Sequence, residues 1–471
     1  MDYVPHTTQE KEEMLREIGV ESAEALFEVI PERLRKATLR LPGALSETEL
    51  ADFFKGLSGR NGHLNQYNSF LGAGVYDHFI PSVIGGLASR GEFLTSYTPY
   101  QPEASQGTLQ VLYEFQTLVC ELTGLDVANA SMYDGATALA EAALLAVRHT
   151  ERNRVMVSRT VHPEYRAVLA TYLKPLEATL VEVQACEGVT DVSALKDRID
   201  EGVAAVILQQ PNFFGCLEEA EAFSAIAHEK GALLIACVNP ISLGLLSPPG
   251  DYGADIAVGD AQPLGNPPFY GGPHVGFFAV RKELMRKIPG RLAGATTDLE
   301  GRRAFVLTLQ AREQHIRRQR ATSNICTNQN LLALRATIYL SALGKEGLRE
   351  LAGLNLQKSH YARDEICALK GFSAPFSKRP FFNEFVVQLP KGLTPDSLNN
   401  RLYKRGIIGG LPLGRFYPEL KDSMLFCVTE NKTRNQIDAL VHSLKEISRG
   451  RPRASRASKV RGRGTQKARK P

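Results

Sequence analysis

Short apolar runs alternate with amphipathic stretches between about residues 125 and 280. The runs have the length of strands, and the stretches between them have the 3.6-residue spacing of helices. Alternation on this scale predicts βαβ units and a mostly parallel sheet covered on both faces. The strand-like runs are 155–157, 179–181, 204–208, 233–238, 256–258 and 276–280, and the helix-like stretches are 136–147, 163–173, 193–201 and 218–230.

The two flanks of this region have other patterns. Helical spacing dominates at 10–18, 23–29 and 110–122, and Ser46 followed by Glu49 is typical of a helix start. A long helix expected at 331–343 precedes strand-like runs at 381–387 and 424–428, as in an α+β module. We therefore expect an N-terminal helical and loop segment over 1–100, a large α/β domain over 101–330, a C-terminal α+β domain over 331–448, and a tail over 449–471.

The net charge of +5 is unevenly distributed along the 471 residues. Residues 449–471 hold ten Lys or Arg and no acid, which leaves 46 basic against 51 acidic residues in the rest. The tail has too few apolar side chains to form a core, so we predict a disordered basic extension. Contact with an acidic partner or nucleic acid is the alternative. The absence of Trp and of aromatic–basic interleaving argues against nucleic acid.

Several classes of protein are excluded by composition. No run of about 18 apolar residues exists, and the polar stretch up to Arg16 lacks the apolar region of a secretory signal. Seven scattered cysteines without a Cys-x-x-Cys pair predict reduced thiols in a cytoplasmic protein, with no metal site. Phosphate-loop, nucleophile-elbow and His-Glu-x-x-His motifs are absent as well.

Five segments carry an unusual combination of motifs. They resemble the N-terminal half of the P-protein of the glycine cleavage system, the glycine dehydrogenase (decarboxylating) family, in its α-type form, over residues 1–445. The basic tail lies outside the resemblance. The segments are 70–74 (FLGAG), 78–81 (HFIP), 97–138 (beginning YTPYQPE), 271–279 (GGPHVGFFA) and 312–327 (REQHIRR, then ATSNICT).

The resemblance implies a fold-type I pyridoxal-phosphate (PLP) transferase fold, an α/β large domain with a smaller C-terminal α+β domain. Such enzymes hold PLP on a lysine that follows a strand, shortly before a Gly-Gly-Pro loop. No lysine lies between Lys230 and Lys282, so this place, around Gln262, is vacant, and Lys282 begins a charged helix. The strand that normally ends in a carboxylate for the pyridine nitrogen ends at Asn239. We therefore expect no covalent PLP and no catalytic residue on this chain alone.

The turn from Ser131 to Thr137 corresponds to the loop that presents N–H groups and a helix N-terminus to the cofactor phosphate in this fold. Asp134 lies in that turn, and a carboxylate repels phosphate. The favoured interpretation is that Asp134 caps the helix that begins at Gly135.

The family's chemistry implies the partners. PLP is expected on a β-type subunit, in a heterodimer that dimerises further. The reaction is decarboxylation of glycine with transfer of the aminomethyl group to the lipoyl group of H-protein, alongside T-protein and L-protein. A non-catalytic scaffold or regulatory subunit that pairs with a PLP enzyme is the alternative.

The active sites of such dimers lie between subunits, and the stretch from Arg317 to Thr327 resembles a loop that reaches the partner's phosphate. It could instead cap the helix beginning near Asn328, and the Tyr97–Glu103 stretch could be a surface turn packed on the helix near Gly107. For His274 and His315, a core or interface role stays open beside catalysis. The candidate pocket or interface residues are Ser96, Tyr97, Tyr100, Gln101, Glu103, His315, Arg317, Arg318, Thr322, Ser323 and Asn324.

Overall fold

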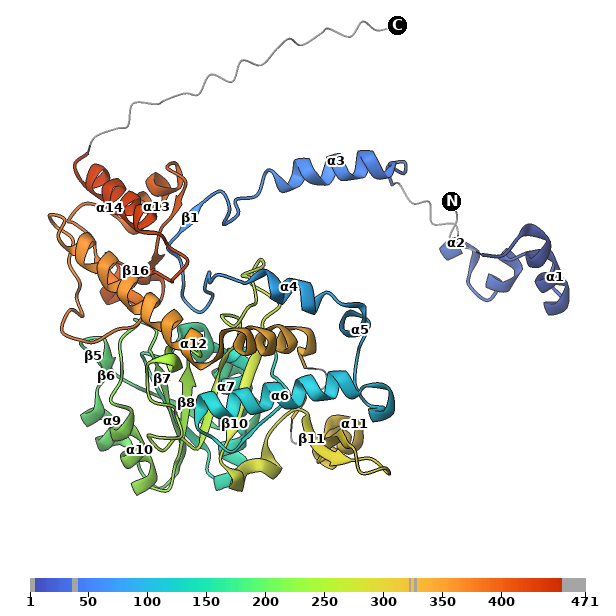
Figure 1. The fold of residues 1–471 in the computed structure, drawn as a ribbon, viewed down its shortest axis with the longest axis horizontal. Coiled ribbons are helices and arrows are strands. Elements are labelled where there is room, and N and C mark those ends of the chain that lie inside the picture. The colour runs from blue at the N-terminus through green and yellow to red at the C-terminus, as the bar shows by residue number, and fades with distance from the viewer. Residues whose placement is uncertain (1–4, 36–40, 322, 326–327, 451–471) are drawn as a thin grey trace, which may run out of the picture. The chain divides into compact units, whose positions relative to one another are not determined.

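The computed structural model describes residues 5–35, 41–321, 323–325 and 328–450. Its contacts divide the chain into two compact units, residues 1–63 and 64–471, and each is described by itself (Figure 1). Of the predicted features, Thr322 and the tail beyond residue 450 lie outside the described residues. No described helix is long and apolar enough to cross a membrane. The domain boundaries at residues 100, 330 and 448 stay predictions.

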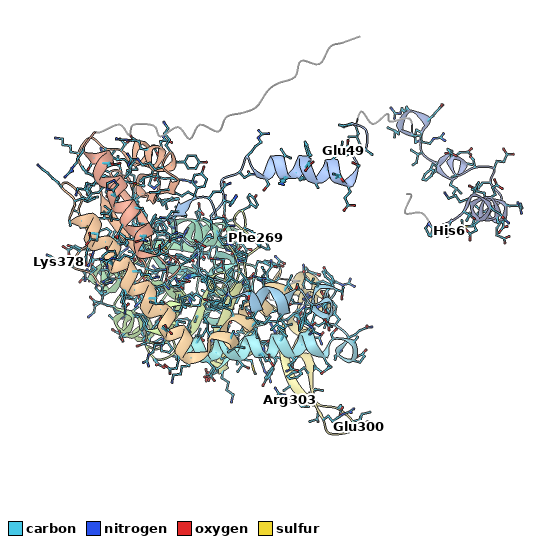
Figure 2. The ribbon with its side chains drawn as sticks, turned by 45° about the horizontal axis from the view of Figure 1, so that its top comes forward. His6, Glu49, Phe269, Glu300, Arg303 and Lys378 are labelled. Atoms are coloured by element: carbon cyan, nitrogen blue, oxygen red, sulfur yellow. The ribbon has the colours of Figure 1, made fainter. Side chains whose placement is uncertain are left out.

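The first unit consists of short helices. A capping box opens α3, in which Ser46 and Glu49 bond each other's backbone N–H groups. Figure 2 shows the side chains of α3, around Glu49, extending on all sides of the helix, and no described side chain of this unit is buried. The apolar side chains of Leu50, Phe53 and Phe54 on α3 therefore have no core among the described residues of the unit. The helices are α1 (Thr8–Ile18), η1 (Glu24–Phe27), α2 (Glu32–Arg35) and α3 (Glu47–Ser58).

The centre of the second unit is a seven-stranded sheet in the order β2-β10-β9-β8-β7-β3-β4. Strands β4, β3, β7, β8 and β9 are parallel, and Val206 lies opposite Met156 on one side and Leu234 on the other. The mostly parallel sheet is thus confirmed. The strands are β2 (Val127–Ala128), β3 (Arg154–Ser158), β4 (Thr179–Val183), β7 (Val203–Gln210), β8 (Leu233–Val238), β9 (Ile256–Asp260) and β10 (Gly276–Val280).

Strand β10 runs antiparallel to β9, although its apolar run looks like the others. Parallel neighbours require a crossover, usually a helix, whereas residues 261–275 between β9 and β10 contain no helix. The chain therefore turns back beside β9, and the same loop carries the Gly-Gly-Pro motif.

Helices cover both faces of the sheet, as the apolar runs require (Figure 1). One core contains side chains of α6, α10 and α12, and the other contains side chains of α7 and α8. Each predicted helix is present, and the ends are shifted by a few residues except in α12, which extends to Cys367. The helices are α6 (Gln106–Thr123), α7 (Gly135–Thr150), α8 (Pro163–Leu173), α9 (Val192–Arg198), α10 (Ala220–Glu229) and α12 (Asn330–Cys367).

Helix α12 leads into the C-terminal module. It is interrupted at Gly344, which has φ 62°, and then continues well beyond the predicted end at residue 343. A three-stranded antiparallel sheet in the order β13-β16-β15 packs with α13 and α14 around a separate core. These elements are β13 (Glu384–Gln388), α13 (Pro395–Tyr403), β15 (Leu411–Pro412), β16 (Ser423–Cys427) and α14 (Arg434–Ser448).

A hairpin of β11 (Leu292–Thr297) and β12 (Arg303–Thr308) was not predicted. Figure 2 shows its tip, near Glu300, projecting from the body. Gln106 and Gln116 of α6 fasten it, since each amide both accepts from and donates to the backbone of one hairpin residue, Phe305 and Ala293 respectively.

Candidate functional site

A small cavity lies at the carboxyl ends of β8 and β9, which is where ligands bind in open α/β sheets. Its volume is about 40 Å³. A space of this size holds a few water molecules and is far too small for the substituted ring and phosphate of PLP. Its lining includes Gly74, Tyr76, His162, Tyr165, Asn239, Asp260 and Pro263. We call this cavity the strand-end pocket.

Gln262 lies in the region that the resemblance to fold-type I enzymes assigns to the cofactor lysine. Its side chain is 1% exposed and forms a two-sided bridge to the backbone of Tyr76. The Tyr76 N–H donates to Oε1 at 2.9 Å, and Nε2 donates to the carbonyls of Tyr76 at 2.9 Å and Asn266 at 2.7 Å. An amide with all these bonds serves to hold the chain together. It offers no amine.

The end of β8 has no carboxylate for a pyridine nitrogen. The chain continues from Val238 into Asn239, whose Oδ1 accepts from the N–H of Ile241 at 3.0 Å. Asn239 therefore closes a local turn, and a neutral amide cannot stabilise a protonated pyridine ring as a carboxylate does.

The N-terminus of α7 is already occupied by two carboxylates. Asp134 forms a capping box with Thr137, whose N–H donates to Oδ1 at 2.7 Å, so the predicted cap is confirmed. The N–H of Gly135 donates to Oδ2 of Asp260 at 3.3 Å. Because the positive end of the helix dipole already faces these two anions, a phosphate at this place would be repelled. Together with Gln262, Asn239 and the small volume, this shows that the residues present do not fit PLP.

Two histidines, one on the pocket wall and one bonded to Asp260, make structural contacts. Nδ1 of His274 lies 2.9 Å from Oδ2 of Asp260, and this carboxylate raises the pKa of His274. His162 contacts the carbonyl of Ala73 through Nε2 at 2.9 Å, and burial lowers its pKa. His162 thereby fastens one wall of the pocket, and His274 holds Asp260, which lines it.

Residues 70–80, which we call the strap, contribute Gly74 and Tyr76 to the pocket wall and are fastened to the C-terminal module. Oε1 of Glu384 accepts from the N–H of Ala73 at 2.6 Å, and Oε2 accepts from the hydroxyl of Tyr76 at 2.8 Å. A side chain at Gly72 would collide with Glu384. Burial raises the pKa of Glu384 to about 7.

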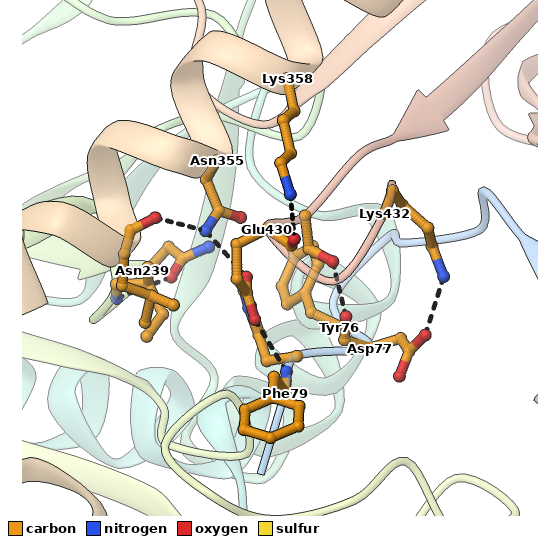
Figure 3. Close-up of polar contacts among 12 residues, drawn as sticks. Tyr76, Asp77, Phe79, Asn239, Asn355, Lys358, Glu430 and Lys432 are labelled. Carbon is orange, nitrogen blue, oxygen red and sulfur yellow. Dashed lines mark hydrogen bonds and ion pairs between the residues drawn. The ribbon is translucent and has the colours of Figure 1, made fainter. Parts of the chain in front are cut away.

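A second buried carboxylate, Glu430, holds the other end of the strap (Figure 3). Its Oε1 accepts from the N–H of Phe79 at 2.7 Å, and its Oε2 lies 2.7 Å from Nδ1 of His78. Lys432 adds an ion pair of 2.9 Å with Asp77. The strap motifs seen in the sequence thus close the pocket by binding the C-terminal module.

The predicted stretch from Tyr97 to Glu103 lies on the surface beside α6. Tyr97 is 80% exposed and Tyr100 is 42% exposed. Gln101 and Glu103 are exposed, with Glu103 in the short helix η2 (Pro102–Ala104). The stretch is attached to α6 as the surface-turn alternative expected, because the amide of Gln106 donates to the carbonyl of Pro102 at 2.8 Å. The predicted Ser96 makes a similar contact, with its Oγ 3.0 Å from that of Thr108.

The predicted loop after β12 presents its arginines to solvent. Arg317 and Arg318 are exposed, with Arg317 ending the short helix α11 (Gln314–Arg317). Oγ of Ser323 accepts from the N–H of Ile325 at 3.1 Å, and Asn324 is exposed. Within the described residues no side chain caps α12 at Gln329, so the capping alternative finds no support there.

Buried charges lie beneath these two stretches and connect them. Arg291 is 1% exposed, and its Nη2 donates to the hydroxyl of Tyr100 at 2.9 Å while its Nη1 donates to Oδ1 of Asn328 at 3.1 Å. Nδ1 of His315 lies 3.7 Å from Oε2 of Glu313, and its ring centroid is 5.3 Å from that of Tyr100. We call these five residues the Tyr100 cluster. The structure therefore brings Tyr100 and His315 together.

A family model for the glycine cleavage system P-protein matches residues 1–444. The chain belongs to this family. A relative from Desulfitobacterium hafniense, named probable glycine dehydrogenase (decarboxylating) subunit 1, is 54% identical over 448 residues, which cover 95% of this chain and 100% of the relative. A relative of the same name from Geobacillus kaustophilus is 55% identical over 443 residues, which cover 94% and 98%.

A solved structure confirms the relationship. It is described as glycine decarboxylase (P-protein) of the glycine cleavage system in inhibitor-bound form, and it matches with a TM-score of 0.89 and 48% identity over 95% of this chain and 100% of that chain. A sphingosine-1-phosphate lyase from Burkholderia pseudomallei shares the fold, with a TM-score of 0.64 and 16% identity over 89% and 94% of the chains. The predicted fold-type I PLP-enzyme fold is thereby confirmed.

In this member of the P-protein family, several residues of the candidate site were not predicted from the sequence, because only the fold brings them together. Arg291 has an unremarkable sequence context, so nothing marked it as a buried arginine beneath Tyr100. Glu384 and Glu430 lie more than 300 positions from the strap residues that they bind. Of the missed residues, Asp260 gave a signal, because it follows an apolar strand run at the carboxyl end where sites form.

Proposed function

We propose that this chain is the subunit of the glycine-decarboxylating P-protein that carries no PLP of its own and completes the active site of a β-type partner. The partner's PLP supplies the electron sink for loss of CO₂ from glycine, and the aminomethyl group passes to the lipoyl group of H-protein. T-protein and L-protein carry out the reactions that follow. We place the reaction in the cytoplasm. The observation that carries this proposal is the strand-end pocket, in which Gln262, Asn239, Asp134 and Asp260 do not fit PLP.

The exposed polar stretches support a role beyond scaffolding. Arg317 and Arg318 provide fixed positive charge, and Ser323 and Asn324 provide neutral donors, on a loop of the large unit. Such donors suit the phosphate of a cofactor held by another chain. The phenols of Tyr97 and Tyr100 lie on the neighbouring stretch, so both could face the same partner pocket.

The test is co-expression of the chain with a homologous subunit that contains the PLP lysine. The wild-type pair should exchange bicarbonate with the carboxyl group of glycine in the presence of lipoylated H-protein, and neither chain should do so alone. Arg317→Ala or Arg318→Ala should weaken cofactor or transition-state binding by roughly 1.5–3 kcal/mol per lost charge-assisted bond, about ten- to a hundredfold.

Arg349→Ala is the matched control, because Arg349 is an exposed arginine on α12 outside both stretches. It should leave exchange unchanged. If every loop variant assembles and exchanges at the wild-type rate while the pair is active, the chain is a scaffold and the site residues are wrong.

A further inference from the structure

We propose that Arg291 is a positioning residue for this reaction, which sets the relative placement of the Tyr100 stretch and the loop from Glu313 to Asn328. The inference rests on the proposed function, in which these two stretches face the partner. It adds that one buried side chain determines how both stretches are presented to the partner.

Burying the charged side chain of Arg291 costs desolvation free energy, so this residue is poorly suited to stabilise the fold. The side chain is 2% exposed, and its opposite charge, Glu313, is 5% exposed with the nearest nitrogen–oxygen distance at 3.9 Å. That distance is too long for a hydrogen bond. Nε of Arg291 and Oε1 of Glu313 have no hydrogen-bond partner among the described residues. Buried pairs with imperfect geometry often stabilise less than apolar residues of similar size.

The hydrogen bonds of Arg291 instead join separate parts of the chain. Nη2 reaches the hydroxyl of Tyr100 and Nη1 reaches Asn328, two residues before the start of α12. The carbonyl of Arg291 accepts from the N–H of Ala130 at 2.9 Å, next to the turn before α7. Three segments that are distant in sequence thus meet at one residue.

The contacts also fix the rings at the surface. The guanidinium carbon of Arg291 lies 5.0 Å from the ring centroid of Tyr100, so both the hydroxyl and the face of this phenol are engaged. The ring of Tyr100 also lies beside the ring of His315, whose Nδ1 is 3.7 Å from Oε2 of Glu313. Movement of Arg291 would therefore displace both Tyr100 and His315.

A planar guanidinium is required for this arrangement. Two different nitrogens of one rigid fork donate to Tyr100 and Asn328, whereas the single ammonium of lysine cannot reach both at the same separation. Arg291→Lys keeps the charge but loses the fork, and Arg291→Met keeps approximate length but loses both.

The experiment measures turnover per assembled complex with the PLP-bearing partner. Arg291→Met should assemble, as judged by sizing, but lower kcat for glycine–bicarbonate exchange at least tenfold with a smaller change in KM for glycine. Arg291→Lys should recover only a fraction. A Tyr100→Phe change added to Arg291→Met should cause little further loss, because coupled residues are not additive.

Arg152→Met is the matched control. The change removes three hydrogen bonds, to the carbonyls of Val203, Lys230 and Gly231, against the two side-chain bonds of Arg291. Arg152 lies just before β3 and bonds the amino ends of β7 and β8, and none of these residues belongs to the Tyr100 cluster. This change should lower the yield of complex without changing kcat per complex. A purely structural role for Arg291 would give this same result.

A second measurement does not depend on activity. Amide hydrogen exchange on the full isolated chain should speed up in both 97–103 and 313–325 for Arg291→Met, and in neither for Arg152→Met. An inactive wild-type pair would refute the proposed function. If the pair is active, an unchanged kcat for both Arg291 variants would overturn this inference. Unchanged amide hydrogen exchange in the two stretches would overturn it as well. If Arg291→Met does not fold, Tyr100→Phe and Asn328→Ala remove its acceptors singly, and unchanged kcat in both would overturn it equally.

Discussion

The strand-end pocket and the Tyr100 cluster belong to the same α/β body, but their polar side chains have different roles. In the pocket, Gln262, Asp260 and Asp134 bond the chain's own backbone, and little space remains. In the cluster, a buried Arg291 supports Tyr100 and His315 at the surface, where other groups can reach them. In the strand-end pocket the polar side chains are used for internal bonds, whereas in the Tyr100 cluster they hold side chains that lie at the surface.

The largest effect is expected from an attempt to restore the lysine. Gln262→Lys breaks the bridge to Tyr76 and places an ammonium in a buried site, which should cost roughly 3–5 kcal/mol of folding free energy. It should not capture PLP, because Asn239, Asp134 and Asp260 remain. Urea unfolding measures the first result and borohydride trapping the second. A stable pyridoxyl adduct at position 262 would show that the pocket is still a cofactor site.

Glu384 should make the strap sensitive to pH. Its folded pKa, about 7, lies above the ordinary glutamate pKa of 4.5, so its stabilising contribution is complete below about pH 4.5 and is lost as the pH rises through 7. The shift corresponds to about 3 kcal/mol of unfolding free energy. Glu384→Gln should flatten this part of the pH profile in urea unfolding between pH 5 and 8. An unchanged slope in the variant would mean that Glu384 does not titrate in this range.

Replacing a glycine by alanine should reduce the stability of the fold at the strand-end pocket but not beside the Tyr100 stretch. A Cβ at Gly259 would lie 2.3 Å from the carbonyl oxygen of Val238 and 2.5 Å from Phe277, so Gly259→Ala should destabilise the fold by roughly 1–3 kcal/mol or more. Gly107, beside the Tyr100 stretch, has nothing within 4 Å of the added atom. Gly107→Ala should be neutral or stabilising by about 0.5–1 kcal/mol. Thermal unfolding of both variants checks the contrast, and equal losses would contradict it.

The smallest effect is expected for Tyr97→Phe. The side chain is 80% exposed, so its hydroxyl should add less than about 0.5 kcal/mol to stability. Turnover of the assembled pair should still fall roughly two- to tenfold if the hydroxyl forms one neutral hydrogen bond across the interface. Steady-state exchange assays on sized complexes measure this, with wild-type turnover as the outcome that removes Tyr97 from the site.

Local patterns predicted the elements of the fold well because strands and helices have their own periodicities. The runs at 233–238 and 276–280 match β8 and β10 residue for residue. The direction of β10 was not predictable from its apolar side chains, since it depends on the path of the connecting loop. The hairpin of β11 and β12 was missed because its strands are half-exposed and contain Gly294, which weakens a strand pattern. The threonines of β11 and the turn residues Asp298 and Gly301 were signals for it.

The candidate site was predictable in what it lacks more than in what it contains. The lysine and the pyridine carboxylate belong to fixed places along the chain, so their replacement by the Gln262 region and Asn239 could be recognised. Contacts such as Arg291 with Tyr100, or Glu384 with Tyr76, join residues separated by 191 and 308 positions. No periodicity carries that information, because it arises only when separate elements pack.

The described helices of residues 1–63 have no core of their own, and this has a consequence for how a cell must make this protein. Capping boxes favour α1 and α3 locally, but side chains such as Phe27, Phe53 and Phe54 are more than half exposed. Apolar segments of this kind attract chaperones and proteases and promote aggregation while nothing covers them. Balanced, simultaneous synthesis with whatever binds these helices should therefore raise the yield of intact chain, and overproduction of the chain alone should shorten its lifetime.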